Sequence, residues 1–272
     1  MSRARARTSP GLGTPLLVVP PALLGVLFLA LPTVALLLRT PWPDLGRIYR
    51  DQQVWTALRL SIESSLEALV ASLVFGVPLA WVLARVRARG MAFVRAIVTI
   101  PLVLPPVIGG VALFSSFGRR GVLGDAIRAV TGHDLPFTYP SIVVAQTFVA
   151  MPFLVITVEG AFRIADRGVE EAAATLGASR WRIFSRVTLP LVLPAIAAGS
   201  VLCWARALGE FGATLLIGGN EPAVTRTLPT LVLTVFQTDP AAAPALSLPL
   251  IAVALIVLGA LRDKWLRPMA SS

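Results

Sequence analysis

The amino-acid sequence predicts an all-α, polytopic membrane protein with six transmembrane helices, and three observations carry that prediction. Hydrophobic residues fill 56% of the 272 positions and charged residues only 14%, whereas a soluble domain has about 25% charged residues. The apolar residues are concentrated in six segments, each near the ~20 residues that a helix needs to cross about 30 Å of hydrocarbon. Strands of a membrane barrel need only about 9–11 residues, so the segments are expected to be helices.

The first apolar segment, residues 16–38, follows three arginines, as the core of a signal peptide would. It is longer than the ~7–15 residues of such a core, and no small-residue cleavage site follows it. We therefore expect an uncleaved helix, with residues 1–53 forming a cytoplasmic tail, this helix and an outer loop. A core of residues 54–261 is expected to hold the other helices, at about 60–84, 96–117, 141–162, 191–218 and 241–261. Residues 262–272 are expected to form a cytoplasmic tail, too short to fold alone.

The helix predicted at 96–117 carries a run of helix-breaking residues, PLVLPPVIGG. Pro105 and Pro106 lack the amide hydrogen that a helix needs, while Gly109 and Gly110 let another helix approach closely. The run predicts a kinked and closely packed helix. The kink is either a static feature or a bend that works as a gate beside a pathway, and the sequence leaves both open.

The basic residues set the expected orientation. The chain has 24 of them, of which only Lys264 is a lysine, and they lie in short groups between the apolar segments. The two tails and the loops 85–95 and 163–190 together carry 15 of them, against 8 in the other three loops. Because basic residues are enriched on the cytoplasmic side, both termini and the loop 163–190 are expected in the cytoplasm.

Several classes of function are excluded by what the sequence lacks. The basic residues do not gather on one soluble face, so nucleic acid is not an expected partner. The only cysteine, Cys203, lies in an apolar segment and the only histidine, His133, in a loop, which allows neither an internal disulfide nor a metal site. A phosphate-binding loop needs a lysine before Ser or Thr, and Lys264 lies in the C-terminal tail. If transport is driven by ATP, a second chain hydrolyses it.

The polar segment 163–190 lies between two long apolar segments and predicts two short helices. Glu170 and Glu171 lie near the start of the first, where carboxylates favour the positive end of the helix dipole. The alanines at 172–174 are strong helix formers that let another protein surface approach closely, and Gly177 is a natural helix stop.

The second short helix begins at Ser179, whose hydroxyl can cap it. It carries Arg180, Trp181 and Arg182, and Pro190 suits the first turn of the helix that follows. From these residues alone, the segment is either a surface loop or a lever that fits a groove of a partner protein.

The same segment resembles the EAA loop of permease subunits in binding-protein-dependent ABC importers. The match runs through Glu171-Ala172-Ala173, Gly177 and the VTLP sequence at 187–190, with Val187 where Ile is usual. The resemblance covers about residues 54–261 and implies the type I importer permease fold. It also implies that this segment is a coupling helix on a cytoplasmic ABC ATPase subunit. ATP and Mg would be bound in that subunit, and no cofactor by this chain. The ATPase-coupling residues are then Glu170, Glu171, Ala172, Ala173, Gly177, Arg180, Leu189 and Pro190.

The substrate class rests on residues 205–220, ARALGEFGATLLIGGN, which are similar to the corresponding segment of molybdate-type permeases. The PLVLPPVIGG run also resembles that subfamily. The resemblance implies an importer of molybdate, with tungstate as a close analogue. Sulfate permeases share a related pattern of Gly, Glu, an aromatic residue and Gly, so sulfate or thiosulfate is the alternative.

Arg206 and Glu210 are four residues apart and are expected on one helix face. A charge at mid-bilayer costs about 2.5–3.5 kcal/mol and such a pair returns only about 0.2–0.5 kcal/mol. The pair is therefore expected to face the bundle interior, a subunit interface or water, either as a fixed ion pair or as a gate that changes partners. The residues predicted for the translocation path or gate are Arg206, Glu210, Phe211, Gly212, Thr214, Pro105 and Pro106.

The resemblance implies a homodimer embedded in the lipid of a prokaryotic inner membrane. An ATPase subunit would dock at each 163–190 loop, and an extracytoplasmic oxyanion-binding protein would deliver the anion. An ion-coupled secondary transporter, with Glu210 as the proton or cation site, is an alternative that needs no ATPase. An intramembrane hydrolase with a Ser–His pair is disfavoured, because His133 lies in an outward loop.

Overall fold

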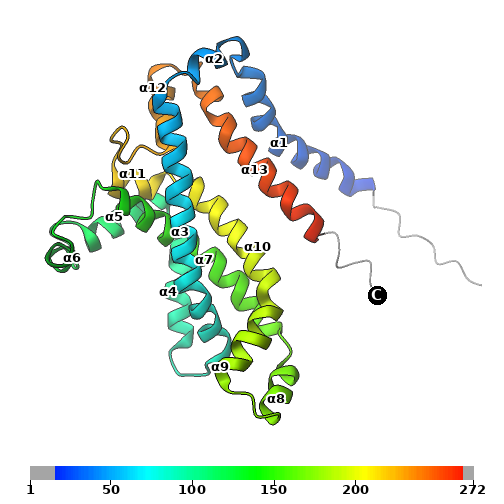
Figure 1. The fold of residues 1–272 in the computed structure, drawn as a ribbon. Coiled ribbons are helices and arrows are strands. Elements are labelled where there is room, and N and C mark those ends of the chain that lie inside the picture. The colour runs from blue at the N-terminus through cyan, green and yellow to red at the C-terminus, as the bar shows by residue number, and fades with distance from the viewer. Residues whose placement is uncertain (1–15, 266–272) are drawn as a thin grey trace, which may run out of the picture.

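The computed structural model describes residues 16–265, and within that range every regular element is a helix (Figure 1). This confirms the predicted all-α class. The predicted N-terminal tail up to residue 15, and residues 266–272 of the predicted C-terminal tail, lie outside the described residues. The α-helices are α1 Val19–Arg39, α2 Leu45–Ile48, α3 Gln52–Arg85, α4 Met91–Val103, α5 Pro106–Phe117, α6 Gly124–Thr131, α7 Tyr139–Ile164, α8 Arg167–Thr175, α9 Arg180–Ile183, α10 Leu189–Leu208, α11 Gly212–Gly218, α12 Leu228–Thr238 and α13 Ala243–Trp265.

The core of the molecule is the bundle of α3, α7 and α10, which lie side by side in Figure 1. Its fully buried side chains include Ala68 of α3, Leu154 of α7 and Cys203 of α10. The helices approach closely where glycines face a neighbour. A Cβ atom on Gly76 would lie 3.2 Å from Val155 Cγ2, which is the small-residue packing expected of helices in a membrane. Cys203 is a free cysteine that packs as a small buried side chain in this core.

The helix predicted at 96–117 is two helices. It begins earlier, as α4, and the chain breaks after Val103 before α5 begins at Pro106. Leu104 and Pro105 adopt extended backbone angles, with ψ of 130° and 134°, because a residue that precedes proline avoids the helical region. The predicted kink is therefore a full interruption of the helix.

The helix predicted at 191–218 is also two helices, because α10 ends at Leu208 and α11 begins at Gly212. Residues 209–211 were predicted within a continuous helix, and the structure corrects this. Glu210 lies in the break, where its carboxylate Oε1 accepts from the amide of Ala213 at 2.8 Å. That hydrogen bond caps the new helix and replaces the main-chain acceptor that the break removes.

Two further boundaries differ from the prediction. Helix α3 begins at Gln52, capped by Asp51 accepting from the amide of Gln53, and not at about residue 60. Residues 228–238, predicted as loop, form α12. Leu228 and Leu231 of α12 pack against Val54 of α3 in a second small core. This packing stabilises α12, which is too short to be recognised from the sequence as a membrane span.

Helix length alone identifies only some of the six predicted membrane spans. Four helical stretches in the described part are long and apolar enough to cross a membrane, namely Val19–Arg39, Gln52–Arg85, Tyr139–Ile164 and Arg180–Leu208. The predicted third span consists of α4 and α5, each shorter than a span, and the sixth corresponds to α13. The predicted number of six spans stays a prediction.

Candidate functional site

Two groups of predicted site residues lie in different parts of the molecule. The predicted coupling residues form α8, α9 and the start of α10 at one end of the bundle (Figure 1). The predicted gate residues lie around the two helix breaks farther along the bundle. Helix α10 joins the two groups, because it begins at Leu189 and ends just before the second break.

The local structure of α8 and α9 follows from three short-range interactions. Asp166 Oδ1 accepts from the amide of Gly168 at 2.8 Å and begins α8. Gly177 then adopts a left-handed φ of +79°, which turns the chain after Thr175. Ser179 Oγ accepts from the amide of Arg182 at 3.4 Å and caps α9. The predicted pair of short helices, with its stop and its second cap, is confirmed.

The chain continues from α9 into α10 without a loop. A π-helical turn, Phe184–Thr188, connects them, and Pro190 lies in the first turn of α10. The backbone therefore stays helical from Arg180 to Leu208.

Glu170 is tied to its own chain. Its Oε1 accepts from Arg85 Nη2 at 2.6 Å and from Thr188 Oγ1 at 2.9 Å. The Arg85 side chain is 9% exposed and the Glu170 side chain 23%. The carboxylate therefore joins α8 to the end of α3 and to the turn before α10. Sequence reasoning placed Glu170 near the helix dipole and missed both partners.

The neighbouring residues point outward. Glu171, Ala172 and Arg180 are exposed, as are the large apolar side chains Leu176 and Trp181. Exposed apolar side chains with small residues between them and charges around them are typical of a protein–protein contact. This surface, made by Glu171, Ala172, Leu176, Arg180 and Trp181, is called the α8–α9 surface below.

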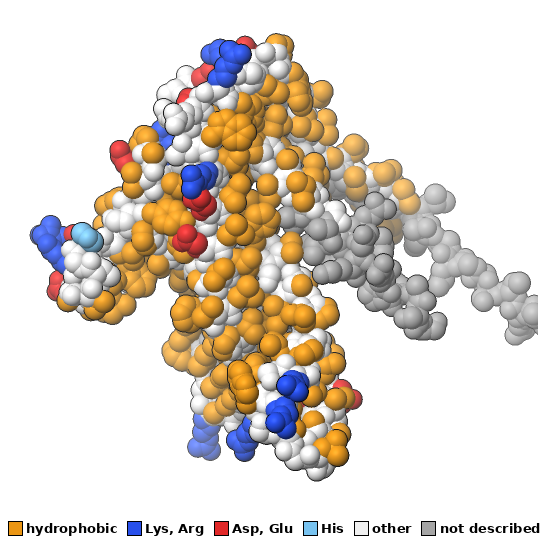
Figure 2. All heavy atoms as spheres, in the orientation of Figure 1, with side chains coloured by type: hydrophobic (Ala, Val, Ile, Leu, Met, Phe, Trp, Pro, Cys, Tyr) orange, Lys and Arg blue, Asp and Glu red, His pale blue; other side chains and the backbone are white. Residues whose placement is uncertain are grey.

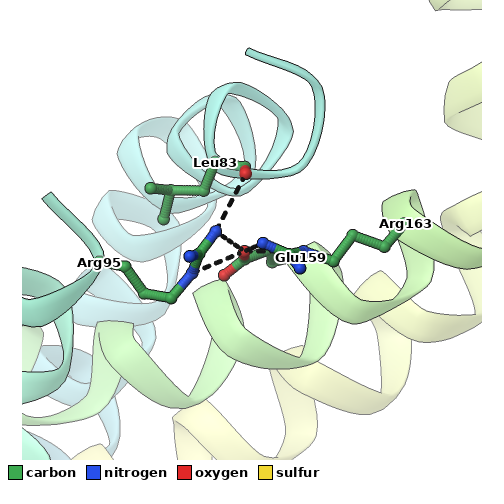
Figure 3. A network of polar contacts seen from close by, with 4 residues as sticks. All are labelled: Leu83, Arg95, Glu159 and Arg163. Atoms are coloured by element: carbon green, nitrogen blue, oxygen red, sulfur yellow. Dashed lines mark hydrogen bonds and ion pairs between the residues drawn. The ribbon is translucent and has the colours of Figure 1, made fainter. Parts of the chain in front are cut away.

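A second ion pair network lies near the same end of the bundle (Figure 3). Arg95 of α4 and Arg163 of α7 converge on one carboxylate oxygen of Glu159, with N–O distances of 2.8 Å for each. Arg95 Nη2 also donates to the backbone oxygen of Leu83 in α3 at 3.3 Å. Arg163 lies four residues after Glu159 on the same helix, whereas Arg95 reaches it from α4. The network links three helices at the point where they enter the α8–α9 end.

Glu210 connects the two half-helices across the second break. Its Oε2 lies 2.6 Å from Arg206 Nη1, at the end of α10, and its Oε1 accepts from the amide of Ala213 in α11. The Glu210 side chain is 1% exposed and that of Arg206 28%. The predicted pairing is confirmed, and the Glu210 carboxylate lies in the interior of the described bundle. Both oxygens of this buried carboxylate have a partner, as a buried charge requires.

The two breaks lie against each other. A Cβ atom on Gly212 would be 3.0 Å from Pro106 Cβ, and one on Gly110 would be 2.6 Å from Leu216 Cβ. Helices α5 and α11 can therefore touch only because glycines face the contact. Thr214 of α11 is fully buried, and its Oγ1 has no hydrogen-bond partner among the described residues. Phe211, in the break, lines an apolar cavity beside α12 and α13.

The distribution of side chains on the surface is the one expected of a membrane protein with polar ends. In Figure 2 apolar side chains cover most of the visible face, and arginines gather at the lower end, where α8 and α9 lie. The residues that sequence reasoning missed, Arg85, Arg95 and Thr188, lie at this end. The only signal for the two arginines was a charge at the end of an apolar segment.

Comparison with known proteins places the chain in a family. The family model described as "Binding-protein-dependent transport system inner membrane component" matches residues 76–268. The molybdenum transport system permease protein ModB of Mycobacterium tuberculosis (strain ATCC 25618 / H37Rv) is 48% identical over 240 residues, covering 88% of this chain and 90% of that protein. ModB of Escherichia coli (strain K12) is 41% identical over 212 residues, covering 78% and 93%. The sulfate transport system permease protein CysT of the same strain is 34% identical over 251 residues, covering 91% and 88%.

Solved structures show the same fold. A chain of a bacterial alginate ABC transporter in complex with its pentasaccharide-bound periplasmic protein has a TM-score of 0.73 at 19% identity, covering 90% of this chain and 91% of that chain. A chain of the MetNI methionine ABC transporter has a TM-score of 0.55 at 24% identity, covering 81% and 96%. The predicted type I importer permease fold is therefore confirmed. By its sequence and its fold, the chain belongs to the family of inner membrane components of binding-protein-dependent transport systems.

Proposed function

We propose that this chain is the membrane-spanning permease subunit of an ATP-driven importer that moves molybdate, or its close analogue tungstate, into the cytoplasm. The observation that supports molybdate as the substrate is the 48% identity, over 88% of the chain, to a protein named a molybdenum transport system permease. The chain moves the anion and does not hydrolyse ATP itself. A cytoplasmic ABC ATPase subunit holds the ATP and Mg, and an extracytoplasmic oxyanion-binding protein delivers the substrate.

The α8–α9 surface is the proposed contact with the ATPase subunit. It is exposed, it carries Leu176 and Trp181, and it lies at the end rich in arginine. When the ATPase subunits close, they push α8 and α9. Glu170 passes that movement to α3 through Arg85, and the continuous helix from Arg180 passes it to α10.

The junction of the two breaks is the proposed gate. Backbone at a helix break has unpaired N–H and C=O groups, which membranes tolerate only inside the protein or beside a water-filled path. Glu210 holds α10 and α11 together in the described state. Movement of α10 changes the distance between Arg206 and Glu210, so the pair is placed to open or close the path with Phe211, Gly212, Thr214, Pro105 and Pro106.

Two copies of the chain form the proposed transporter, with the path between them in a prokaryotic inner membrane. No side chain of α1 is fully buried against the rest of the chain, which leaves a mostly exposed apolar helix for lipid or a second copy. Both termini are proposed to be cytoplasmic, because the loops 85–95 and 163–190 carry nine basic residues and the two tails six more, against eight in the other three loops.

Sulfate or thiosulfate transport is the alternative function, and the 34% identity to a sulfate permease supports it less than the higher identities support molybdate. The test is uptake into proteoliposomes that hold this chain, its ATPase and its binding protein. We expect molybdate uptake that stops when the ATPase carries a substitution of its phosphate-loop lysine. Uptake driven by an ion gradient with that inactive ATPase would contradict the proposal and favour a secondary transporter.

A further inference from the structure

A small pocket lies between the first turn of α3 and the loop that joins α11 to α12. Its volume is about 210 Å³, and it is lined by Gln52, Gln53, Thr56, Ala57, Pro222, Ala223 and Arg226. Arg226 is the only ionisable side chain among these. In Figure 1 the first turn of α3 and α12 lie at the end of the molecule away from α8 and α9. The pocket is thus remote from the α8–α9 surface, and none of the predicted site residues lines it.

The guanidinium of Arg226 is held by neutral acceptors from two elements. Nε donates to Asn220 Oδ1 at 2.9 Å, Nη2 to the backbone oxygen of Asn220 at 3.1 Å, and Nη1 to Gln53 Oε1 at 3.1 Å. Asn220 is itself fixed, because its Nδ2 donates to Thr234 Oγ1 of α12 at 2.9 Å. Among the described residues, no carboxylate lies within 4.0 Å of this guanidinium. The pocket therefore contains a positive charge that is fixed in place and has no counter-ion there.

The loop that carries Arg226 is tightly built. The backbone oxygen of Glu221 accepts from the amides of Thr225 and Arg226, both at 3.0 Å, and Thr225 Oγ1 accepts from the amide of Glu221 at 2.9 Å. Ala223 has a φ of +61°, a conformation that costs a residue with a Cβ roughly 1–2 kcal/mol. The surrounding hydrogen bonds hold this strained turn, so the pocket is formed before any partner arrives.

We propose that this pocket receives one carboxylate side chain of the extracytoplasmic binding protein when that protein docks on the permease. The proposal rests on the proposed function, which supplies such a partner. A guanidinium has five N–H donors. Three are used here, and the remaining two are the number that one carboxylate takes in a bidentate pair.

The charge and the surroundings of the pocket favour a protein carboxylate over the transported anion. A carboxylate carries one negative charge, which Arg226 neutralises, whereas a divalent tetrahedral oxyanion would leave one charge without a partner in the pocket. Pro222 and Ala223 form an exposed apolar rim of the pocket, and the exposed Val224 follows them in the chain. Such a rim adds contact area for a protein surface and gives nothing to a small hydrated ion.

The test measures the affinity of the purified binding protein for the complete transporter in lipid nanodiscs, together with ATPase activity. Arg226→Gln is compared with Arg50→Gln, which removes an equally positive but exposed charge at the same end of the molecule. We expect Arg226→Gln to weaken binding by roughly 30-fold or more, because it truncates one partner of a hydrogen-bonded charge pair. Arg226→Lys, which keeps the charge but loses the bidentate geometry, should fall between wild type and Arg226→Gln. Arg50→Gln should change binding by no more than about twofold.

A second experiment separates docking from an effect on folding. ATPase activity without the binding protein should stay at the wild-type level in Arg226→Gln, since the pocket is remote from α8 and α9. The defect of Arg226→Glu should be relieved by changing one acidic residue of the binding protein to Arg, which a purely structural role for Arg226 would not allow. Unchanged binding of Arg226→Gln with lost uptake would overturn the proposal in favour of the free anion. Equal weakening in both Gln variants would overturn it in favour of general charge attraction. A wild-type complex whose ATPase does not respond to the binding protein would instead contradict the proposed function.

Discussion

Removal of the Glu170 carboxylate is predicted to release α8 from the bundle without harming the contact with the ATPase. Glu170 accepts from Arg85 Nη2 at 2.6 Å and from Thr188 at 2.9 Å, and Arg85 Nε and Nη1 have no hydrogen-bond partner among the described residues. Glu170→Ala therefore leaves a guanidinium that is only 9% exposed without its counter-ion.

The magnitude follows from burial. Breaking a buried ion pair by removing one partner costs about 3–5 kcal/mol. Because the Glu170 side chain is 23% exposed, water reaches the vacated site, and we expect about 2 kcal/mol. This corresponds to a factor of roughly 30 in the equilibrium between attached and released α8.

Hydrogen exchange of the amides in α8 measures that equilibrium, and the ratio of ATP hydrolysed to molybdate taken up measures its consequence. We expect faster exchange in α8 and more ATP hydrolysed per molybdate in Glu170→Ala. Replacing Arg85 with Leu in the same chain should recover part of the loss, because it removes the unpaired charge. Glu171→Ala is the matched control: Glu171 is exposed, so its loss should weaken ATPase docking and leave exchange in α8 unchanged. Wild-type exchange and wild-type coupling in Glu170→Ala would show that the Glu170–Arg85 pair does not hold α8 to the bundle.

Three further predictions concern the gate and the turn after α8. Gly110→Leu should lower the free energy of unfolding by about 1–3 kcal/mol, because its Cβ would lie 2.6 Å from Leu216 Cβ, and the melting temperature in detergent should fall accordingly. Gly25→Leu is the control: its Cβ would have nothing within 4 Å, and the variant should melt like wild type. Glu210→Gln should destabilise the chain by about 2 kcal/mol and slow uptake, since Arg206 loses its partner, and the double variant with Arg206→Gln should melt at a higher temperature than Glu210→Gln alone. Gly177→Val should cost about 1–2 kcal/mol locally, because of the left-handed φ of +79°, and should uncouple ATP hydrolysis from uptake; an unchanged ratio of ATP to molybdate would count against a coupling role for this turn.

The helices could be predicted from the sequence more fully than their interruptions. Every long helix of the described part was predicted from a long apolar segment, because a helix that crosses the lipid has a characteristic length and composition. The break at 209–211 was missed, since a glycine, one charged residue and an aromatic residue are also compatible with a continuous helix. The hydrogen bond from the Ala213 amide to Glu210, which stabilises the start of a new helix, cannot be recognised from the residue types alone. Helix α12 was missed because its 11 residues are stabilised by packing against α3 and α13.

The candidate site divides in the same way. The cap at Ser179, the stop at Gly177 and the α8–α9 pair depend on neighbours within a few residues, so local rules predicted them. The different environments of Glu170 and Glu171 could not be predicted, because Arg85 lies 85 positions away in sequence. Arg95 likewise meets Glu159 across 64 positions, and only the packed bundle brings them together.

The most direct test of the central claim is ATP-dependent molybdate uptake in proteoliposomes that contain this chain with its ATPase and binding protein, measured with and without excess sulfate. We expect uptake that requires ATP and persists in the presence of sulfate. Uptake abolished by sulfate would contradict the molybdate assignment, and uptake without ATP would contradict the importer itself.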